Sequence, residues 1–383
     1  MNGGNPDLIE FVREKIRQDG PVAFAWFMEQ ALYHPQFGYY SSGQCQIGRR
    51  GDYFTNVSVG PLFGRMLASQ FAEMWEIMGR PDDFTIVEQG AHHGEFAYDV
   101  LAAMREFPAT LRYCIIEPFP ILQARQEQTL TEFGHEVIWT KSLTNLEPFS
   151  GVHFSNELID SMPVRLIARH AGGEWQEKFV ADSGSNFVFI TKPIADPQLR
   201  AALEKIPRNE DATYETEVNL AAPDWIQTVA QKLQHGFVLA VDYGYPRPEF
   251  YAAERTIGTL QSFARHHTVS SPLDDVGRVD ITAHVEWTTV AERAEDSGLK
   301  LIGFTDQHHF MTALLARHTP AESERRTLQT LLHPEFLGTR FQYLAFGKNV
   351  PTETLTGFRF AREPRQGLGL PMRHLIPPKS LSS

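Results

Sequence analysis

The feature that most constrains the fold of this chain is a series of short, continuously apolar segments that alternate with helical ones. These segments are rich in β-branched residues and occur at residues 84–88, 113–117, 136–140, 152–155 and 237–242. A strand without alternating polar residues is buried on both faces, and such strands form parallel sheets with helices on each side. The sequence therefore predicts a doubly wound α/β fold.

The 383 residues divide into three predicted parts. Residues 1–80 contain helical stretches around an aromatic, glycine-rich loop, and we expect them to cap the functional site. Residues 81–348 form the core, which carries an insertion at about 161–222 and ends in two strands that complete a seven-stranded sheet. Residues 349–383 are rich in proline and show no clear period, which predicts a flexible tail.

The composition excludes several classes of protein. The chain carries 35 basic and 47 acidic residues, a net charge of −12, whereas a surface that binds nucleic acid or an anionic membrane needs an excess of positive charge. Its cysteines, Cys45 and Cys114, lie far apart, which excludes a zinc knuckle or a disulfide framework. The N-terminus lacks a basic segment followed by an apolar run, and no apolar run approaches the ~20 residues that span a bilayer. We therefore expect a cytoplasmic protein that binds no nucleic acid and has no membrane span.

A glycine-containing turn follows the first strand of the core. Glu88, Gly90 and Gly94 lie in this turn, directly before a predicted helix. Glycine lets the backbone approach a ligand, the helix N-terminus offers unpaired N–H groups, and the carboxylate can accept hydrogen bonds from an ammonium or a hydroxyl. The position suits a nucleotide-like cofactor, although two glycines in such a turn also occur for structural reasons alone.

Glu117 ends the next strand, where an acidic residue in such a sheet commonly holds the two hydroxyls of a ribose. The alternative is a solvated carboxylate at a strand end. The turn and Glu117 suit a dinucleotide and S-adenosylmethionine equally well, so these two features leave the cofactor open.

Polar side chains also follow the fourth and fifth strands. Asn156, Glu157 and Asp160 come after the fourth strand, and Asp242 and Tyr243 end the fifth. Ligands of open α/β sheets bind at the carboxyl edge of the strands, so these residues would face one cleft. Core packing does not account for three polar side chains directly after a buried strand. The alternative to a ligand-binding role is a solvated turn.

Ten short motifs occur in a fixed order, among them Asn-Glu-Leu-Ile-Asp-Ser-Met-Pro at residues 156–163. The others occupy residues 20–21, 33–40, 51–55, 88–95, 116–118, 242–245, 258–260, 280–285 and 344–348. Together they resemble the MidA-like family of S-adenosylmethionine-dependent methyltransferases, whose mitochondrial members methylate an arginine of a respiratory complex I subunit. The resemblance covers about residues 20–348.

The resemblance implies a class I methyltransferase fold with an antiparallel last strand, S-adenosylmethionine as cofactor, and a protein arginine, such as one in a respiratory complex subunit, as acceptor. It implies that the cofactor is bound by Thr55, Glu88, Gly90, Gly94, Glu117 and Asn156. Carboxylates can grip a guanidinium and accept its proton, and the catalytic candidates are Glu157 and Asp160, with Asn156 orienting the site. The candidates on the substrate side are Tyr39, Tyr53, Asp242, Tyr243 and His284. The oligomeric state stays open, with a homodimer as one alternative.

Three other functions remain as alternatives: a small-molecule O- or N-methyltransferase, a non-catalytic assembly factor that binds S-adenosylmethionine, and a dinucleotide oxidoreductase. An enclosed apolar pocket would favour a small acceptor, whereas an open acidic groove would favour a peptide arginine. The motifs beyond residue 120 count against the oxidoreductase.

His92 stands where the turn of the family has the middle one of three alternating glycines, and its imidazole adds bulk near the cofactor. We expect cofactor binding to be retained, because Glu88, Glu117 and the segment at residues 51–55 are intact. Adjacent histidines occur at residues 92–93, 266–267 and 308–309. Neighbouring side chains on a helix or strand project in different directions, so these pairs predict no metal site.

Overall fold

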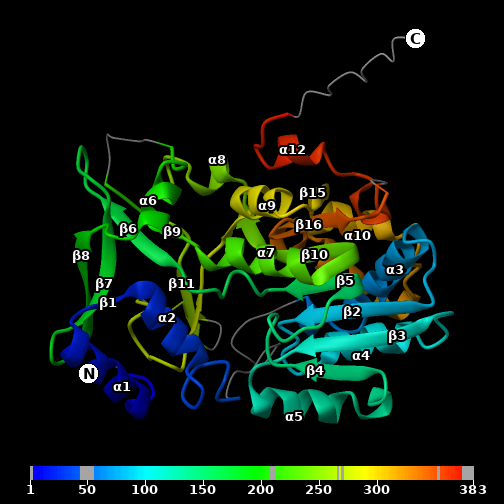
Figure 1. The fold of residues 1–383 in the computed structure, drawn as a ribbon, viewed down its shortest axis with the longest axis horizontal. Coiled ribbons are helices and arrows are strands. Elements are labelled where there is room, and N and C mark those ends of the chain that lie inside the picture. The colour runs from blue at the N-terminus through cyan, green and yellow to red at the C-terminus, as the bar shows by residue number, and fades with distance from the viewer. Residues whose placement is uncertain are drawn as a thin grey trace.

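A central sheet with helices on both faces runs through the molecule (Figure 1). The computed structural model describes residues 3–43, 56–207, 213–264, 267–268, 271–351 and 354–372. Within these residues the sheet has eight strands, seven of which form the path β15-β16-β10-β5-β2-β3-β4, while β14 pairs with β10. The strands are β2 (Asp83–Gln89), β3 (Thr110–Ile116), β4 (Val137–Thr140), β5 (Phe149–Asn156), β10 (Leu233–Tyr245), β14 (Val285–Glu286), β15 (Lys300–Asp306) and β16 (Phe341–Lys348).

The strand directions match the predicted sheet. β4, β3, β2, β5 and β10 run parallel to one another, whereas β16 runs antiparallel to both β10 and β15. The α/β class and the antiparallel last strand are therefore confirmed. The short β14 makes the observed sheet one strand wider than the predicted seven.

The central strands of the sheet are buried on both faces. Phe84 and Ile86 of β2 point into one apolar cluster, and Val87 points into a second one on the other face. The first face is covered by α3 (Leu62–Ile77), α4 (Glu95–Ala103) and α10 (Gln307–Leu314), and the second by α7 (Ala221–Lys232) and α9 (Trp287–Asp296). Since successive side chains point to opposite faces, burial on both sides requires a continuous apolar run.

The N-terminal helices pack on the insertion. β1 (Val22–Ala23) pairs antiparallel with β7 in a five-stranded sheet of order β1-β7-β6-β9, with β8 beside β7, and α1 and α2 share an apolar cluster with this sheet. The predicted cap of residues 1–80 is thus divided, because α3 belongs to the core. The other elements of this lobe are α1 (Pro6–Asp19), α2 (Phe24–Tyr33), β6 (Arg165–Arg169), β7 (Gln176–Asp182), β8 (Phe187–Pro193), α6 (Pro197–Leu203) and β9 (Tyr214–Val218).

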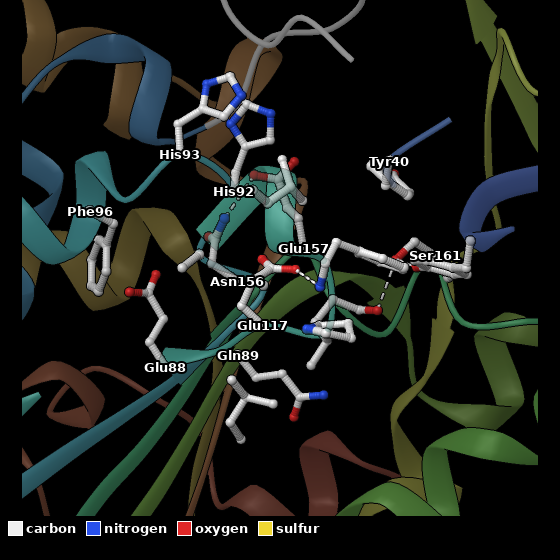
Figure 2. A pocket seen from close by; sticks show the side chains of 18 of the residues that line it. Tyr40, Glu88, Gln89, His92, His93, Phe96, Glu117, Asn156, Glu157 and Ser161 are labelled. Atoms are coloured by element: carbon white, nitrogen blue, oxygen red, sulfur yellow. Dashed lines mark hydrogen bonds between the residues drawn. The ribbon is translucent and has the colours of Figure 1, made fainter. Parts of the chain in front are cut away.

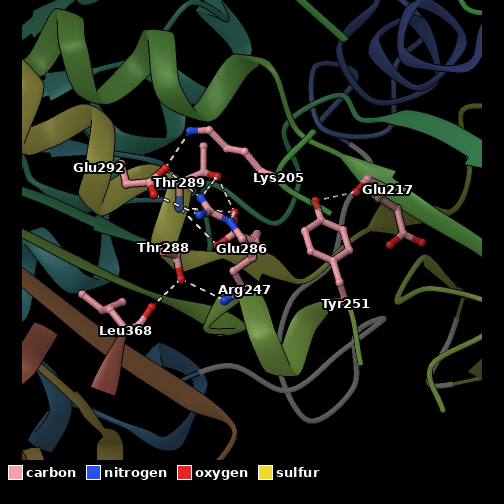
Figure 3. Close-up of polar contacts among 9 residues, drawn as sticks. All are labelled: Lys205, Glu217, Arg247, Tyr251, Glu286, Thr288, Thr289, Glu292 and Leu368. Atoms are coloured by element: carbon pink, nitrogen blue, oxygen red, sulfur yellow. Dashed lines mark hydrogen bonds and ion pairs between the residues drawn. The ribbon is translucent and has the colours of Figure 1, made fainter. Parts of the chain in front are cut away.

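An ion-pair network joins the insertion to the core (Figure 3). Glu292 on α9 accepts a hydrogen bond from Lys205 Nζ at 2.7 Å, just beyond α6, and another from Arg247 Nη2 at 2.7 Å, on α8 (Arg247–Phe250). Arg247 also donates to the Thr289 hydroxyl at 2.9 Å. Of these two cations, Lys205 belongs to the insertion and Arg247 to the core, and both line a second cavity of about 350 Å³.

Residues 354–372 pack against the core, which differs from the predicted flexible tail at 349–383. Leu355, Phe358 and Leu368 are buried, and Arg365 forms an ion pair with Glu295 at 2.6 Å. The segment contains η5 (Thr356–Phe358) and α12 (Pro364–Gly367). Its apolar side chains follow no period because they dock on surfaces that only the folded core provides.

The remaining elements are short. β11 (Gln261–Ala264), β12 (His267–Thr268) and β13 (Asp280–Thr282) form a small sheet, and the other helical segments are η1 (Val57–Val59), α5 (Pro120–Thr129), η2 (Thr131–Phe133), η3 (Glu322–Glu324), α11 (Arg325–Leu332) and η4 (Pro334–Gly338). In the described part of the chain, no helix combines the length and the apolar character that crossing a membrane requires.

Candidate active site

A cavity of about 570 Å³ opens at the carboxyl edge of β2, β3 and β5 (Figure 2). This volume is within the range of small-molecule sites. Among the predicted site residues that the structure describes, those that line the cavity are Glu88, Gly90, Glu117, Asn156 and Glu157. Residues far apart in the sequence meet here because parallel strands end at the same edge of the sheet.

The turn after β2 adopts left-handed backbone conformations at three positions. Gly90 and Gly94 both have φ +87°, and His92 has φ +47°. A side chain on Gly90 would face Leu158 at 3.6 Å, so the glycine is required by its φ rather than by crowding. Gly94 precedes α4 and faces Leu130 at 3.4 Å, and it is not among the lining residues. Gln126 of α5 lies at 3.5 Å from the same position, so Gly94 lets α4 and α5 approach closely, and its contact with the cofactor stays a prediction.

The two histidines of this turn lie together, contrary to the expectation that neighbouring side chains diverge. The rings of His92 and His93 have centroids 3.6 Å apart, because the positive φ of His92 turns its side chain back toward His93. One nitrogen from each and a carboxylate oxygen of Glu95 lie within 4.8 Å of one another, close enough to be metal ligands. Arg125 Nη1 lies 2.8 Å from His93 Nε2, and its positive charge opposes a cation at this place.

Glu88 is buried at the end of β2. Its Oε2 accepts a hydrogen bond from the Tyr113 hydroxyl at 2.7 Å, and burial raises the pKa of Glu88 to about 8. The predicted carboxylate therefore lies at the cavity with one oxygen already engaged.

Glu117 follows β3 and has 6% of its surface exposed. Its Oε1 accepts from the Phe119 N–H at 2.9 Å and its Oε2 from Gln126 Nε2 at 2.9 Å. Burial raises the pKa of Glu117 to about 7, although these two donors oppose the shift. The carboxylate is thus fixed in orientation at the cavity wall, with lone pairs left for ligand hydroxyls.

Asn156 and Glu157 end β5 and begin the next turn. Asn156 Nδ2 donates to Glu157 Oε1 at 2.9 Å, and the Tyr243 hydroxyl approaches Glu157 Oε2 at 3.4 Å. Glu157 has φ +52°, which is uncommon for a residue with a side chain. Burial, with Asp242 and Asp280 nearby, raises the pKa of Glu157 to about 8.

Asp242 holds this turn through its carboxylate and is not among the residues that line the cavity. Its Oδ2 accepts from the backbone N–H groups of Leu158, Ile159 and Asp160 at 2.8–3.2 Å, and its Oδ1 accepts from the Tyr243 N–H. Its assignment to the substrate side stays a prediction, and the structure shows its carboxylate occupied by four backbone N–H groups. An acidic residue at a strand end gives the same sequence pattern whether it binds a ligand or a turn.

Asp160 lies behind the cavity wall and is not among the lining residues. Burial, together with the nearby charges of Asp242, Glu157 and Asp280, raises the pKa of Asp160 well above its ordinary value. Of the pair expected to hold one ligand, the structure places Glu157 at the cavity and Asp160 behind it. Their joint contact with a ligand stays a prediction.

The other residues predicted for the substrate side lie at different places in the structure. Tyr39 is buried in the apolar cluster of the N-terminal lobe, and its neighbour Tyr40 lines the cavity instead. Tyr243 contacts Glu157 but is not a lining residue. His284 lines the second cavity, and burial lowers its pKa to about 4. Tyr53 and Thr55 lie outside the described residues.

Three aromatic residues were not predicted as part of the site. Tyr33 stacks on Tyr40 and on Phe119, with centroid distances of 5.5 and 6.4 Å, and all three line the cavity. The Tyr33 hydroxyl donates to Ser161 Oγ at 2.8 Å, and the Tyr40 hydroxyl donates to Asp280 at 2.6 Å. The aromatic, glycine-rich loop was the available signal, but its pattern does not tell which ring faces inward.

Comparisons with known proteins agree with this geometry. A family model described as an S-adenosyl-L-methionine-dependent methyltransferase matches residues 66–305. The mitochondrial protein arginine methyltransferase NDUFAF7 homolog of Drosophila melanogaster is 26% identical, over 89% of this chain and 85% of that protein. The mitochondrial protein arginine methyltransferase NDUFAF7 of Homo sapiens is 24% identical, over 94% and 87%. A crystal structure from Burkholderia thailandensis with S-adenosyl-homocysteine bound is 32% identical, with a TM-score of 0.85 over 94% of this chain and 98% of that one.

Proposed function

This chain belongs to the MidA-like family of S-adenosylmethionine-dependent methyltransferases, and we propose that it transfers the methyl group to an arginine side chain of a protein. The observation that carries this proposal is the acidic cluster at the cavity, in which Glu157 lines the wall and Asp160, Asp242 and Asp280 lie behind it. A guanidinium is cationic and planar, and carboxylates are its natural partners.

The described residues of the cavity fit the cofactor of the family. When bound, S-adenosylmethionine supplies an electrophilic methyl group on a positively charged sulfur. Glu117, held by Phe119 and Gln126, would bind the ribose hydroxyls. Gly90 exposes bare backbone at the turn, and Asn156 presents an amide at the end of β5.

Glu157 would hold and orient the acceptor. Asn156 and Tyr243 approach its two carboxylate oxygens from different sides, so the group is fixed before the acceptor binds. Burial raises its pKa to about 8, and a guanidinium beside it would favour the charged form again. The carboxylate would align one nitrogen with the methyl group and then accept the proton that this nitrogen loses.

The named relatives are protein arginine methyltransferases, which supports a protein as acceptor, and a subunit of a respiratory complex is the first candidate to test. The cytoplasmic location and the homodimer remain predictions.

The test replaces Glu157 and measures two properties. We expect Glu157→Gln to abolish methyl transfer to arginine peptides, because the amide keeps the shape and removes the charge. Calorimetry should show the affinity for S-adenosyl-homocysteine near that of the wild type. Glu174→Gln, an exposed position on the insertion, is the matched control and should change neither property.

A second arm replaces the acceptor. Peptides in which the arginine is changed to lysine should not be methylated, since an ammonium cannot make a planar two-point contact. Full turnover by Glu157→Gln, or methylation of a small phenol or amine but of no arginine peptide, would contradict the proposal.

A further inference from the structure

His92 has a buried polar atom without a partner at the cofactor cavity. The residue lines the cavity (Figure 2), and in the described part of the chain its buried Nε2 has no hydrogen-bond partner. A buried polar atom without a partner is unfavourable, and such atoms are often satisfied by a ligand.

The position of His92 is fixed by its neighbours. Its carbonyl oxygen accepts a hydrogen bond from Gln126 Nε2 at 2.8 Å, and its ring stacks on His93, which Arg125 contacts at 2.8 Å. Its φ of +47° is unfavourable for a residue with a side chain. Strained residues of this kind persist where the surroundings hold them, and they concentrate at functional sites.

The same nitrogen of Gln126 connects His92 with Glu117. Gln126 Nε2 donates both to the His92 carbonyl oxygen at 2.8 Å and to Glu117 Oε2 at 2.9 Å. The two residues therefore share one stretch of the cavity wall. Glu117 is the residue proposed above for the ribose, so His92 is adjacent to the nucleoside end of the cofactor.

We propose that His92 is a cofactor-binding residue whose Nε2 forms a hydrogen bond with a ribose hydroxyl, beside Glu117. The inference rests on cofactor binding and does not depend on the arginine acceptor. Burial and the adjacent His93 and Arg125 lower the pKa of His92 to about 3, so the ring is neutral near pH 7. A hydroxyl both donates and accepts, and it can therefore pair with either tautomer of a neutral imidazole.

The opposite interpretation is that the imidazole only crowds a turn where relatives have glycine. His92→Gly separates the two, because glycine relieves both the crowding and the backbone strain. If the ring is a ligand contact, calorimetry should show S-adenosyl-homocysteine binding weakened about three- to tenfold, the range of a neutral hydrogen bond. Unchanged or tighter binding would overturn the proposal.

Glycine at position 92 could also weaken binding by making the turn more flexible, and a ligand that lacks the ribose hydroxyls distinguishes this effect from a lost hydrogen bond. The 2′,3′-dideoxy analogue of S-adenosyl-homocysteine should bind wild type and His92→Gly with nearly equal affinity, because the partner of Nε2 is absent. An equal loss for both ligands would show that the substitution only loosens the turn, and it would overturn the ribose contact. This cycle isolates the pairwise contribution.

The matched control is His309→Ala. His309 is half exposed on α10, where its ring pairs with Asp306 at 2.7 Å, and it does not line the cavity. We expect this variant to bind both ligands as the wild type does. Thermal unfolding of each variant shows that the protein is folded. Because every readout is binding, the result stands whether or not an arginine is the methyl acceptor.

Discussion

The buried carboxyl groups of this protein differ in the hydrogen-bond donors that surround them. Asp242 and Glu117 both follow a buried strand, but four backbone N–H groups surround the Asp242 carboxylate, whereas Glu117 keeps lone pairs toward the cavity. Within the described residues, the donors to Glu157 are the side chains of Asn156 and Tyr243. Whether a carboxylate can bind a ligand or instead stabilises a turn therefore depends on how many hydrogen bonds its oxygens already accept within the protein.

The ribose assignment of Glu117 predicts a loss of binding on its removal. Glu117→Ala should weaken S-adenosyl-homocysteine binding by about 1.5–3 kcal/mol, the range for hydrogen bonds to a charged group. Calorimetry measures this change directly. Glu127→Ala, at an exposed position of the same helix that carries Gln126, is the control. Equal affinities of Glu117→Ala and wild type would remove Glu117 from the site.

At the scale of elements, turns and terminal segments depend on distant partners. The turn after β5 is held by Asp242 from β10, more than 80 residues later. The C-terminal segment is likewise held by the core. The ring centroid of Phe358 lies 5.1 Å from that of Phe310 on α10, and the Phe358 ring fills the space above Gly303. Neither arrangement can be recognised from the local sequence.

The docking of the C-terminal segment predicts that one of its side chains belongs to the core. Phe358→Ala should lower the free energy of unfolding by about 3–5 kcal/mol, because a buried aromatic ring is removed and a cavity remains. The control is Phe360→Ala two residues later, which is 51% exposed and should change stability by about 0.5 kcal/mol or less. Chemical denaturation measures both, and similar effects would show that the segment is not docked in solution.

Across the whole molecule, burial shifts the pKa of titratable groups, and several of these groups line the cofactor cavity. Burial raises the pKa of Glu88 and Glu157 to about 8 and that of Glu117 to about 7. Burial also lowers the pKa of His92 and His153 to about 3. The folded state thus holds its carboxyl groups protonated and its histidines neutral over much of the range where the unfolded chain does the opposite.

These shifts predict how stability changes with pH. The folded protein binds more carboxyl protons than the unfolded chain between about pH 4.5 and 8, so this stabilisation is lost as the pH rises through about 8. The depressed histidine pKa values act oppositely, and their stabilisation is lost below about pH 6.5. We expect the free energy of unfolding, without ligand, to fall between about pH 6.5 and 8.5.

Urea unfolding at several pH values checks this expectation. Glu157→Gln is the informative variant, since an amide has no proton to lose and the decline from pH 6.5 to 8.5 should become less steep. Rising stability over that interval in the wild type would show that the cavity carboxyl groups are better solvated than the structure indicates.

The sequence by itself determined the core strands and helices, because burial on both faces demands continuous apolar runs and these need no knowledge of distant partners. It also placed Glu88, Gly90, Glu117, Asn156 and Glu157 at one edge, since parallel strands end together. The family motifs identified the cofactor.

Only the tertiary structure decided which polar groups face the ligand. In the folded protein Asp160 and Asp242 lie outside the cavity lining, and Tyr40 rather than Tyr39 is a lining residue. Gln126 holds His92 beside Glu117. The tertiary structure also paired β1 with β7 and docked the C-terminal segment. These outcomes depend on which donor or apolar surface reaches a side chain from elsewhere in the fold, and local patterns carry no information about that.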